Sequence, residues 1–187
     1  MENLFEYFDK IHSIGKEAKS ALSSLVRVKN FDKNEIIQKP YSICSNIYIV
    51  KDGIARIFYY KDGNDITEHF AFPKDVIVRA ESLFNQSSTP KGIQAIENTE
   101  VFAINSIKLF QMYNDFHDIE RLFRLIFEKE YVNTVKRMES LQIKSATERY
   151  IELSTETDFL KHIPLKYIAS YLGITQVSLS RIRANLK

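Results

Sequence analysis

The chain has 187 residues, of which 44% are hydrophobic and 27% are charged, a composition typical of a globular protein with one ordinary domain and a small second one. It contains no run of eighteen apolar residues, and acids and lysines interrupt the apolar residues of its N-terminus, so we expect a cytoplasmic protein without a membrane partner. Cys44 is the single cysteine, which excludes an intrachain disulfide and a four-cysteine zinc or iron–sulfur site built from one chain.

The formal net charge of +2 is unevenly distributed along the chain. Residues 159–187 carry five bases and no acid, whereas the rest of the chain carries 21 bases and 24 acids. A basic end on an otherwise balanced protein attracts a polyanion, and nucleic acid is the usual cytoplasmic candidate. A basic tail that is merely solvated is the alternative.

The first segment, residues 2–24, is expected to be helical. Its apolar residues recur at three to four positions, as on one face of a helix. They are Leu4, Phe5, Phe8, Ala18, Leu22 and, just beyond the segment, Leu25.

From about Val26 to Asn105 the pattern changes to short apolar or alternating runs such as "IYIV", "GIARIFYY" and "GIQAI", separated by turn residues. Asp52-Gly53 and Asp62-Gly63 are expected to form hairpin turns, because glycine tolerates the positive φ that those turns need. Strands at this spacing predict an antiparallel barrel, sandwich or roll.

After Asn105 the helical period returns. Ser106 is expected to cap a short helix, and residues 118–141 then run without Gly or Pro, long enough to span about 36 Å. Such a helix either crosses the whole β unit or pairs with a copy of itself, so we expect a homodimer. Lys129 and Asn133 interrupt the heptad, so a regular coiled coil is not expected.

The stretch "IASYLGITQVSLSRIR" predicts two short helices around a tight turn. Pro164 can open the first helix, Gly173 supplies the turn, Ile174 fills the corner and Thr175 caps the second helix. Two helices joined by a short turn that contains Gly form a helix-turn-helix, whose second helix can enter the major groove of DNA. A plain helical hairpin with a solvated face is the alternative.

The polar residues of the second helix suit double-stranded DNA. Gln176, Ser178 and Ser180 can bond base edges, and Arg181 can reach guanine with both arms of its guanidinium. Thr175, Arg183 and Lys187 are better placed for phosphate, which supplies affinity without sequence information.

This terminal segment, "IPLKYIASYLGITQVSLSRIRANLK", resembles the DNA-binding end of the Crp/Fnr family of bacterial transcription regulators, in particular the short members common in Bacteroidetes. The resemblance extends over nearly the whole chain. It implies an α+β fold with an N-terminal antiparallel β-roll (a double-stranded β-helix of the cyclic-nucleotide-binding type), a long dimerisation helix and a C-terminal winged helix-turn-helix. The expected boundaries are 1–115 for the sensor, 116–142 for the helix and 143–187 for the DNA-binding domain.

The resemblance also implies the partners and some of the site. Gln176, Ser178 and Arg181 map to the recognition helix of the family, while Val177 stands where many members have Glu, which permits a contact with a thymine methyl. Expected partners are a palindromic operator in double-stranded DNA, a second copy of the chain, RNA polymerase and a small-molecule effector of unknown identity.

The effector pocket expected from the resemblance would involve Val78, Arg79, Glu81, Lys91 and Gly92. In relatives that bind cyclic nucleotides, Gly-Glu holds the ribose and an arginine followed by a small hydroxyl residue neutralises the phosphate. Here Val78-Arg79 stands in place of Gly-Glu, and Lys91-Gly92 stands near the phosphate-binding pair. We therefore expect an effector other than cyclic AMP, although Lys91 can attract an anion.

No metal, cofactor or catalytic residue is expected. A metal-dependent enzyme on a similar roll would need two histidines one residue apart and a nearby Glu, but only His69, after Glu68, lies in the strands. The other histidines, His12, His117 and His162, are scattered. The main hypothesis is a homodimeric, sequence-specific transcription regulator. The alternatives left open are a ligand-binding module whose helix-turn-helix contacts proteins, and a metal-dependent β-roll enzyme.

Overall fold

The computed structural model describes residues 2–186 and begins with two helices, α1 (Glu2–Asp9) and α2 (Lys16–Leu25). The single helical segment predicted for residues 2–24 is therefore interrupted at residues 10–15. The Gly15 amide donates a hydrogen bond of 2.7 Å to Asp118 Oδ2 near the start of the long helix α5 (His117–Ile143). This contact ties the break between the two N-terminal helices to α5.

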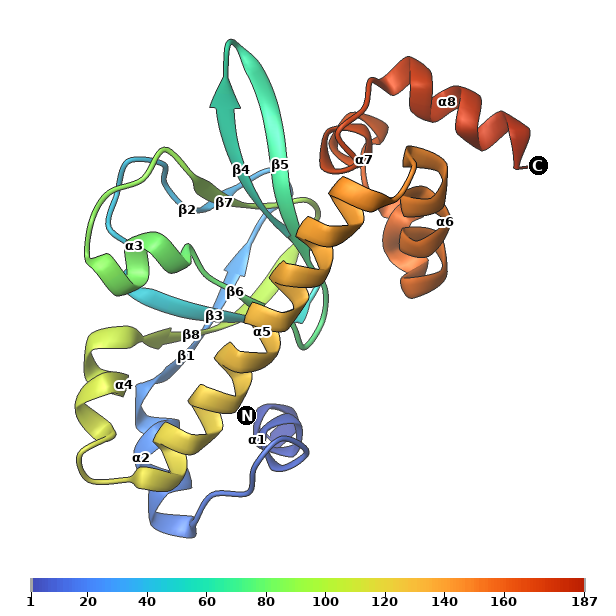
Figure 1. Ribbon diagram of the computed structural model, residues 1–187. Helices are drawn as coiled ribbons and strands as arrows, with labels where there is room; N and C mark the ends of the chain where they lie inside the picture. The colour runs from blue at the N-terminus through green and yellow to red at the C-terminus, as the bar shows by residue number, and fades with distance from the viewer. Residues whose placement is uncertain (1, 187) are drawn as a thin grey trace.

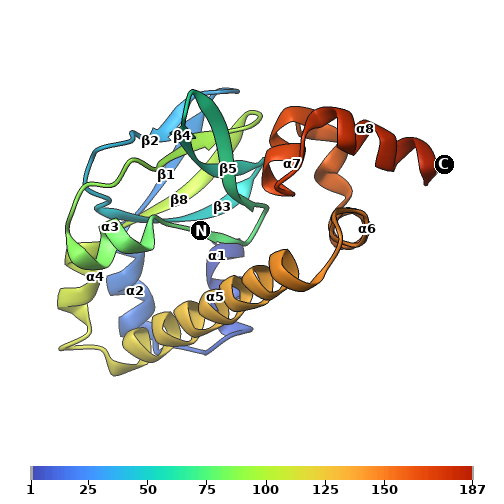
Figure 2. The same ribbon diagram turned by 45° about the horizontal axis from the view of Figure 1, so that its top comes forward.

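Eight strands then form two four-stranded sheets that face each other (Figures 1 and 2). The strands are β1 (Val26–Phe31), β2 (Ile36–Gln38), β3 (Asn46–Asp52), β4 (Ala55–Lys61), β5 (Asn64–Ala71), β6 (Val76–Ile77), β7 (Gly92–Ala95) and β8 (Thr99–Asn105). Their order is β1-β8-β3-β6 in one sheet and β2-β7-β4-β5 in the other, and the paired strands are antiparallel. The predicted antiparallel β unit is confirmed.

The two predicted Asp-Gly turns differ in what they connect. Asp62 and Gly63 both have positive φ, 51° and 76°, and close the two-residue hairpin between β4 and β5, as predicted. Gly53, with φ 85°, instead leads from β3 in one sheet to β4 in the other. The hairpin predicted at Asp52-Gly53 was wrong, because a local turn signal does not specify which sheet receives the next strand.

The space between the sheets is filled mostly by small and branched apolar side chains. The cluster consists of Ile37, Tyr48, Val50, Ala55, Ile57, Ala71, Ile77, Ile93, Ala95, Val101 and Ala103. Between β6 and β7 the chain forms the short helix α3 (Ala80–Asn85). We call residues 78–92, from the end of β6 to the start of β7, the cassette.

Helix α5 follows α4 (Ser106–Met112) and runs diagonally across the molecule (Figure 1). The cap of α4 is Asn105, whose side chain accepts the Lys108 amide at 3.0 Å, so the predicted cap at Ser106 lies one residue too late. The first turns of α5 bury Ile119, Leu122 and Phe123 against α1 and α2. No described helix is long and apolar enough to cross a membrane.

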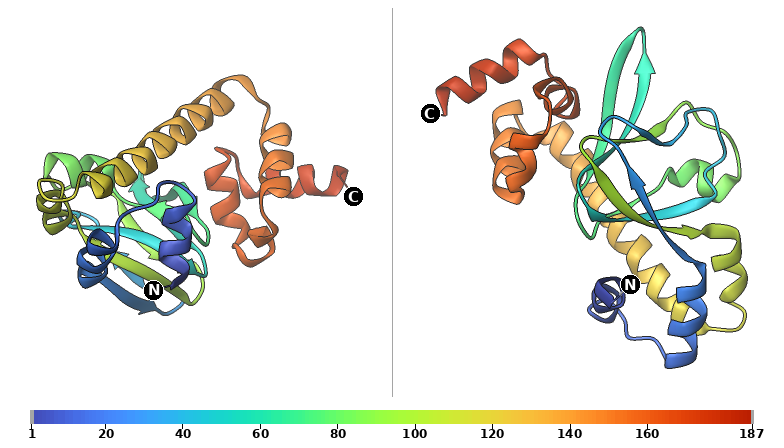
Figure 3. Two further views of the ribbon diagram at one scale, coloured as in Figure 1. Left: turned by 90° about the horizontal axis from the view of Figure 1, so that it is seen from below. Right: turned by 180° about the vertical axis from the view of Figure 1, so that it is seen from behind.

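The chain ends in four helical pieces, α6 (Ala146–Glu156), the 3-10 helix η1 (Asp158–His162), α7 (Leu165–Tyr171) and α8 (Gln176–Asn185). They lie beside the end of α5 and the β4–β5 hairpin (Figures 1 and 3). Within residues 144–186 the structure contains helices only, so the wing implied by the resemblance is not among the described residues.

The terminal helices share a hydrophobic core with the roll. Ile54, Phe70 and Ile96 of the roll belong to one buried cluster with Leu153, Ile163, Tyr167, Ile168, Ala169, Leu172 and Leu179. The terminal segment is therefore packed against the strands and not merely linked to them by α5.

Two of the positive-φ glycines, Gly53 and Gly63, allow a matched test of the turn into β4. A Cβ at Gly53 would lie 2.4 Å from the Asn98 carbonyl oxygen, whereas a Cβ at Gly63 would meet nothing within 4 Å. Gly63→Ala should cost about 1 kcal/mol, from the left-handed backbone alone. Gly53→Ala should cost roughly 3 kcal/mol or more, because backbone must also move. Urea unfolding of both variants checks this, and equal losses would contradict the steric argument.

Candidate functional site

The turn between α7 and α8 is built as the sequence predicted. Gly173 adopts φ 69°, and the Ile174 amide donates a hydrogen bond of 3.0 Å to the Ala169 carbonyl. Thr175 caps α8 by accepting the Ser178 amide at 3.1 Å. The cap satisfies a free amide at the start of α8 and fixes the direction in which the helix leaves the turn.

Helix α8 is exposed along almost its whole length. Among its described residues only Leu179 is buried, and Ile182 is half-buried. At 100° per residue, Val177, Arg181 and Ala184 lie on the side opposite Leu179. Val177 is 62% exposed. This outer stripe is the surface that α8 presents to solvent.

The predicted contact residues divide between this stripe and its flanks. Arg181 lies on the outer stripe, whereas Gln176, Ser180 and Arg183 lie on one flank and Ser178 on the other. The Ser178 hydroxyl is 3.0 Å from the Thr175 hydroxyl, so the cap already engages part of its hydrogen-bonding capacity. Lys187 lies outside the described residues. Asn185 flanks the outer stripe next to Ser178. It was not among the DNA-contacting residues predicted from the sequence, although its position on the helix follows from the 100° spacing.

Arg183 faces a groove of 410 Å³ between α6, η1, α7 and α8. Lys161 of η1 also lines this groove, together with the hydroxyl residues Ser154 and Thr157. The two cations therefore lie on the same side of the terminal helices as the Gln176 flank of α8. The two cations make this groove attractive to an anionic group.

In the cassette, Arg79 is buried with 2% of its surface exposed. Its guanidinium donates to the Lys91 carbonyl at 2.6 Å and to the Ser42 carbonyl at 2.5 Å, with Thr89 Oγ1 at 3.5 Å. Its Nε has no partner among the described residues. The arginine therefore joins the two ends of the cassette to the loop before β3, through neutral acceptors.

The other predicted pocket residues do not converge on Arg79. The Lys91 side chain forms an ion pair of 2.5 Å with Glu68, and Glu81 is exposed. Val78 packs against the core beside α5. A Cβ at Gly92 would lie 2.8 Å from the Phe58 ring, so this glycine serves close packing. The structure brings only Arg79 and the Lys91 backbone together.

His69 lies in no cluster of metal-ligating side chains among the described residues. Within residues 2–186 no group of three or more His, Cys, Asp or Glu side chains is placed to hold a metal ion. His69 is half-buried on β5, and burial, reinforced by the nearby Arg137 cation, lowers its pKa to about 4. Its neutral ring is part of the packing where β5 meets α5.

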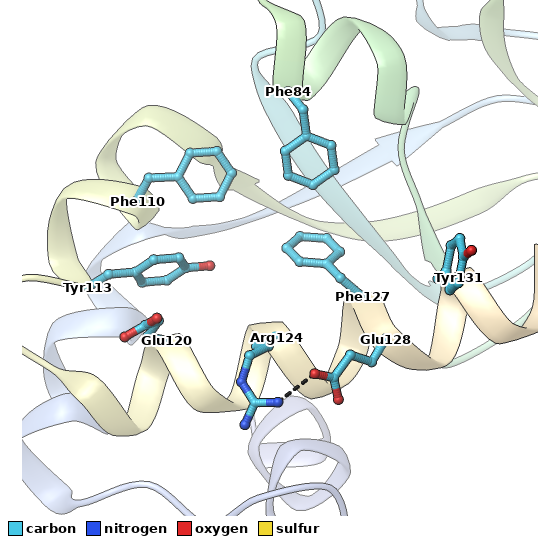
Figure 4. A pocket seen from close by; sticks show the side chains of 8 residues that line it. All are labelled: Phe84, Phe110, Tyr113, Glu120, Arg124, Phe127, Glu128 and Tyr131. Carbon is cyan, nitrogen blue, oxygen red and sulfur yellow. Dashed lines mark hydrogen bonds and ion pairs between the residues drawn. The ribbon is translucent and has the colours of Figure 1, made fainter.

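A second groove, of 420 Å³, lies between α3, α4 and α5 (Figure 4). Phe84 of α3 meets Phe127 of α5 edge to face at 5.3 Å and stacks with Phe110 of α4 at 6.3 Å. Phe84 remains 53% exposed. Burial, reinforced by Glu120, raises the pKa of the Tyr113 hydroxyl, which has no hydrogen-bond partner among the described residues.

This groove continues into a stripe along the rest of α5. Phe127, Tyr131, Thr134, Met138 and Leu141 follow one another at alternating intervals of four and three residues, which is the spacing of a coiled-coil seam. Tyr131 is 71% and Met138 54% exposed. We call these five residues the α5 seam. Lys129 and Asn133 lie on other sides of the helix, so they do not interrupt it.

Comparison with known proteins agrees with this architecture. The family model of the cyclic nucleotide-binding domain matches residues 28–116, which span the roll and α4. No curated protein matches the chain.

Solved structures match almost the entire chain. FixK2 from Bradyrhizobium japonicum superposes with a TM-score of 0.74 at 23% identity, covering 86% of this chain and 84% of FixK2. CLP from Xanthomonas campestris, described as a c-di-GMP-responsive global regulator, gives 0.71 at 12% identity, covering 92% and 91%. A protein from Eubacterium rectale assigned to the Crp/Fnr family gives 0.69 at 18% identity, covering 92% and 83%. Residues 28–116 thus match the model of the cyclic nucleotide-binding domain, and the chain has a fold like that of these solved regulator structures.

The lowered pKa of His69 predicts a pH dependence of stability. An unfolded histidine takes up a proton near its ordinary pKa of about 6.5, whereas native His69 stays neutral down to about 4. The unfolded state therefore binds more protons in this window, and stability should fall by on the order of 1 to 3 kcal/mol as pH drops from 6.5 to 4. Chemical unfolding at several pH values checks this, with His69→Gln as the variant in which that part of the slope should vanish. A slope unchanged in His69→Gln would assign the effect to other groups.

Proposed function

We propose that this protein is a sequence-specific DNA-binding transcription regulator that acts as a homodimer. The observation that carries the proposal is α8, a capped helix after a tight turn, exposed along its outer stripe and set in a segment without acids. Residues 159–186 contain four bases and no acid, so the terminal helices present positive charge where α8 projects. A protruding helix with this charge fits the major groove.

The division of α8 into stripe and flanks suggests separate roles on DNA. Arg181 and Val177 on the outer stripe are placed to meet base edges, the arginine at guanine and the valine at a thymine methyl. Lys161 and Arg183 on the groove side are placed to meet phosphates. Gln176 and Ser180 lie between these two groups.

The dimer is proposed to form along the α5 seam. An exposed 4-3 stripe of Phe, Tyr, Met and Leu is what a helix presents to a parallel copy of itself. The partner helix would also cover the groove beside Phe84 and could supply a hydrogen-bond acceptor for the buried Tyr113 hydroxyl. Two copies of α8 related by a two-fold axis would then read half-sites about 34 Å apart in a palindrome.

The cassette argues against cyclic AMP as the effector. Arg79 already donates to two backbone carbonyls, and Glu81 points to solvent, so neither a free phosphate receptor nor a ribose carboxylate is present in this arrangement. An effector acting here would carry an anionic group that competes for the Arg79 guanidinium.

Selection of bound duplexes from a random pool tests the central proposal. An enriched palindrome is the expected result, while no enrichment favours the alternative that the terminal helices contact a protein. On the enriched duplex, Arg181→Ala should cost about 1 to 3 kcal/mol and relax preference at one base pair. Arg183→Ala is the matched control. It should weaken binding to all duplexes alike and reduce the slope of log affinity against log salt concentration by about one, the value for one phosphate contact. Equal losses on specific and random duplexes from Arg181→Ala would contradict a base-reading role.

The seam is tested by charge insertion. Met138→Glu places a carboxylate in the proposed interface and should convert the dimer to monomers in sedimentation equilibrium at micromolar concentration. Asn133→Glu adds the same charge to an exposed position about a third of a turn away from the seam, and should leave the dimer intact. Dimers of equal strength in both variants would place the interface elsewhere.

A further inference from the structure

We infer that α7 is clamped to the rest of the molecule by two arginines, each stacked on one tyrosine of α7, and that this clamp positions α8. The first arginine comes from β4 of the roll and the second from α5. The contacts are features of the free chain, and their consequence for DNA rests on the proposed function above.

The first stack joins the roll to α7. The Arg56 guanidinium carbon lies 3.7 Å from the centre of the Tyr167 ring, and only 1% of Arg56 is exposed. Asp65 accepts from both Nη atoms at 2.6 and 2.8 Å, and Gln94 Oε1 accepts from Nε and Nη2 at 2.9 and 2.7 Å. Thr67 accepts from Nη1 at 2.9 Å. These acceptors fix the plane of the guanidinium, so its face is held toward the Tyr167 ring.

The second stack joins α5 to α7 one helical turn further on. The Arg137 guanidinium carbon lies 3.6 Å from the centre of the Tyr171 ring. Its Nη2 donates to the Tyr171 carbonyl at 2.8 Å, and its Nε donates to the Glu68 carbonyl at 3.2 Å. Tyr167 and Tyr171 are four residues apart and lie on the same face of α7.

Two stacks restrict the orientation of α7 more than one stack can. A single stack would hold α7 against the roll while leaving it free to turn about the contact. The second stack blocks this rotation, and Ser170 adds a polar contact by accepting the Thr67 amide at 2.9 Å. Desolvated arginine–aromatic stacks are the stronger class of cation–π contact.

Helix α8 must follow α7. The turn between them is short, and Leu179 of α8 is fully buried in the cluster that contains Tyr167 and Ile168. The clamp therefore sets the direction of the outer stripe of α8 relative to α5. In a dimer, the same contacts would fix the distance between the two copies of α8.

The clamp is connected to the end of the cassette through Lys91 and, just beyond the cassette, to Gln94. Lys91, whose carbonyl holds Arg79, pairs through its side chain with Glu68, and the Glu68 carbonyl accepts Arg137. Three residues later on β7, Gln94 holds Arg56. A shift of residues 91–94 would therefore disturb both arginines, which makes this short segment the route from an effector at Arg79 to α8.

Hydrogen exchange of the free protein tests the clamp without DNA. Tyr167→Leu and Tyr171→Leu should each accelerate exchange of the α7 and α8 amides by roughly tenfold, the change expected from losing about 1.4 kcal/mol of local stability. Exchange in β3 and β8 should be unchanged.

Three further variants serve as controls. Tyr167→Phe keeps the ring, so its exchange should match that of the wild type. Arg137→Lys should accelerate exchange in α7 and α8 as Tyr171→Leu does, whereas Arg121→Lys, at an exposed site on α5, should leave exchange unchanged. Unchanged α7 exchange in the leucine variants, or equal acceleration throughout the chain, would overturn the clamp.

A DNA measurement then separates positioning from base reading. Tyr167→Leu should lose about tenfold in affinity for the enriched palindrome and retain wild-type affinity for a duplex with one half-site, because each α8 is intact and only its placement is loosened. Arg181→Ala should weaken both duplexes while leaving α7 exchange unchanged. Equal loss on both duplexes for Tyr167→Leu would overturn the positioning role. If no palindrome is enriched, the regulator proposal fails while the exchange experiment still decides the clamp.

Discussion

The buried charge of Arg56 is the constraint on which the arrangement of the terminal helices depends. A guanidinium removed from water is costly unless its donors are paired and its charge is balanced. Asp65, Gln94 and Thr67 meet this requirement from β5 and β7, and the Tyr167 ring covers the remaining face. The four contacts come from two strands and one helix. The strands pair the donors of Arg56 once the roll is folded, and docking of α7 adds the Tyr167 ring over the face of the guanidinium. A hydrophobic contact alone would tolerate sliding, whereas the fork of a guanidinium does not.

The two buried arginines of the roll are satisfied in different ways. Arg56 has a carboxylate partner, while Arg79 donates to the carbonyls of Ser42 and Lys91, and its Nε has no partner among residues 2–186. A cation held by neutral acceptors is the less well balanced of the two, and an anion near it would be favoured. Arg56, whose charge is balanced by a carboxylate, therefore lies where the roll contacts α7. Arg79, whose charge is not, lies in the cassette, and residues 91–94 connect the two sites.

Helix α5 serves different neighbours at its two ends. Its first turns are buried against the N-terminal helices, and Arg137 in its last third reaches the Glu68 and Tyr171 carbonyls. The seam occupies a third side, beginning at Phe127, where Phe84 connects it to α3. One rigid helix therefore touches the cassette, the proposed partner copy and α7.

Much of this organisation was predictable from the sequence, because its signals are local. Alternating apolar runs predicted the strands, Gly173 and Thr175 predicted the turn and cap before α8, and the 4-3 spacing from Phe127 to Leu141 was readable although the seam was overlooked. The tertiary structure decided what local signals do not carry. It showed that Gly53 crosses between sheets, that Arg79 is used inside the cassette, and that Arg56 and Arg137 meet tyrosines far along the chain. Each of these depends on which distant backbone lies within reach of a long side chain, and no pattern of neighbours in the sequence encodes that distance.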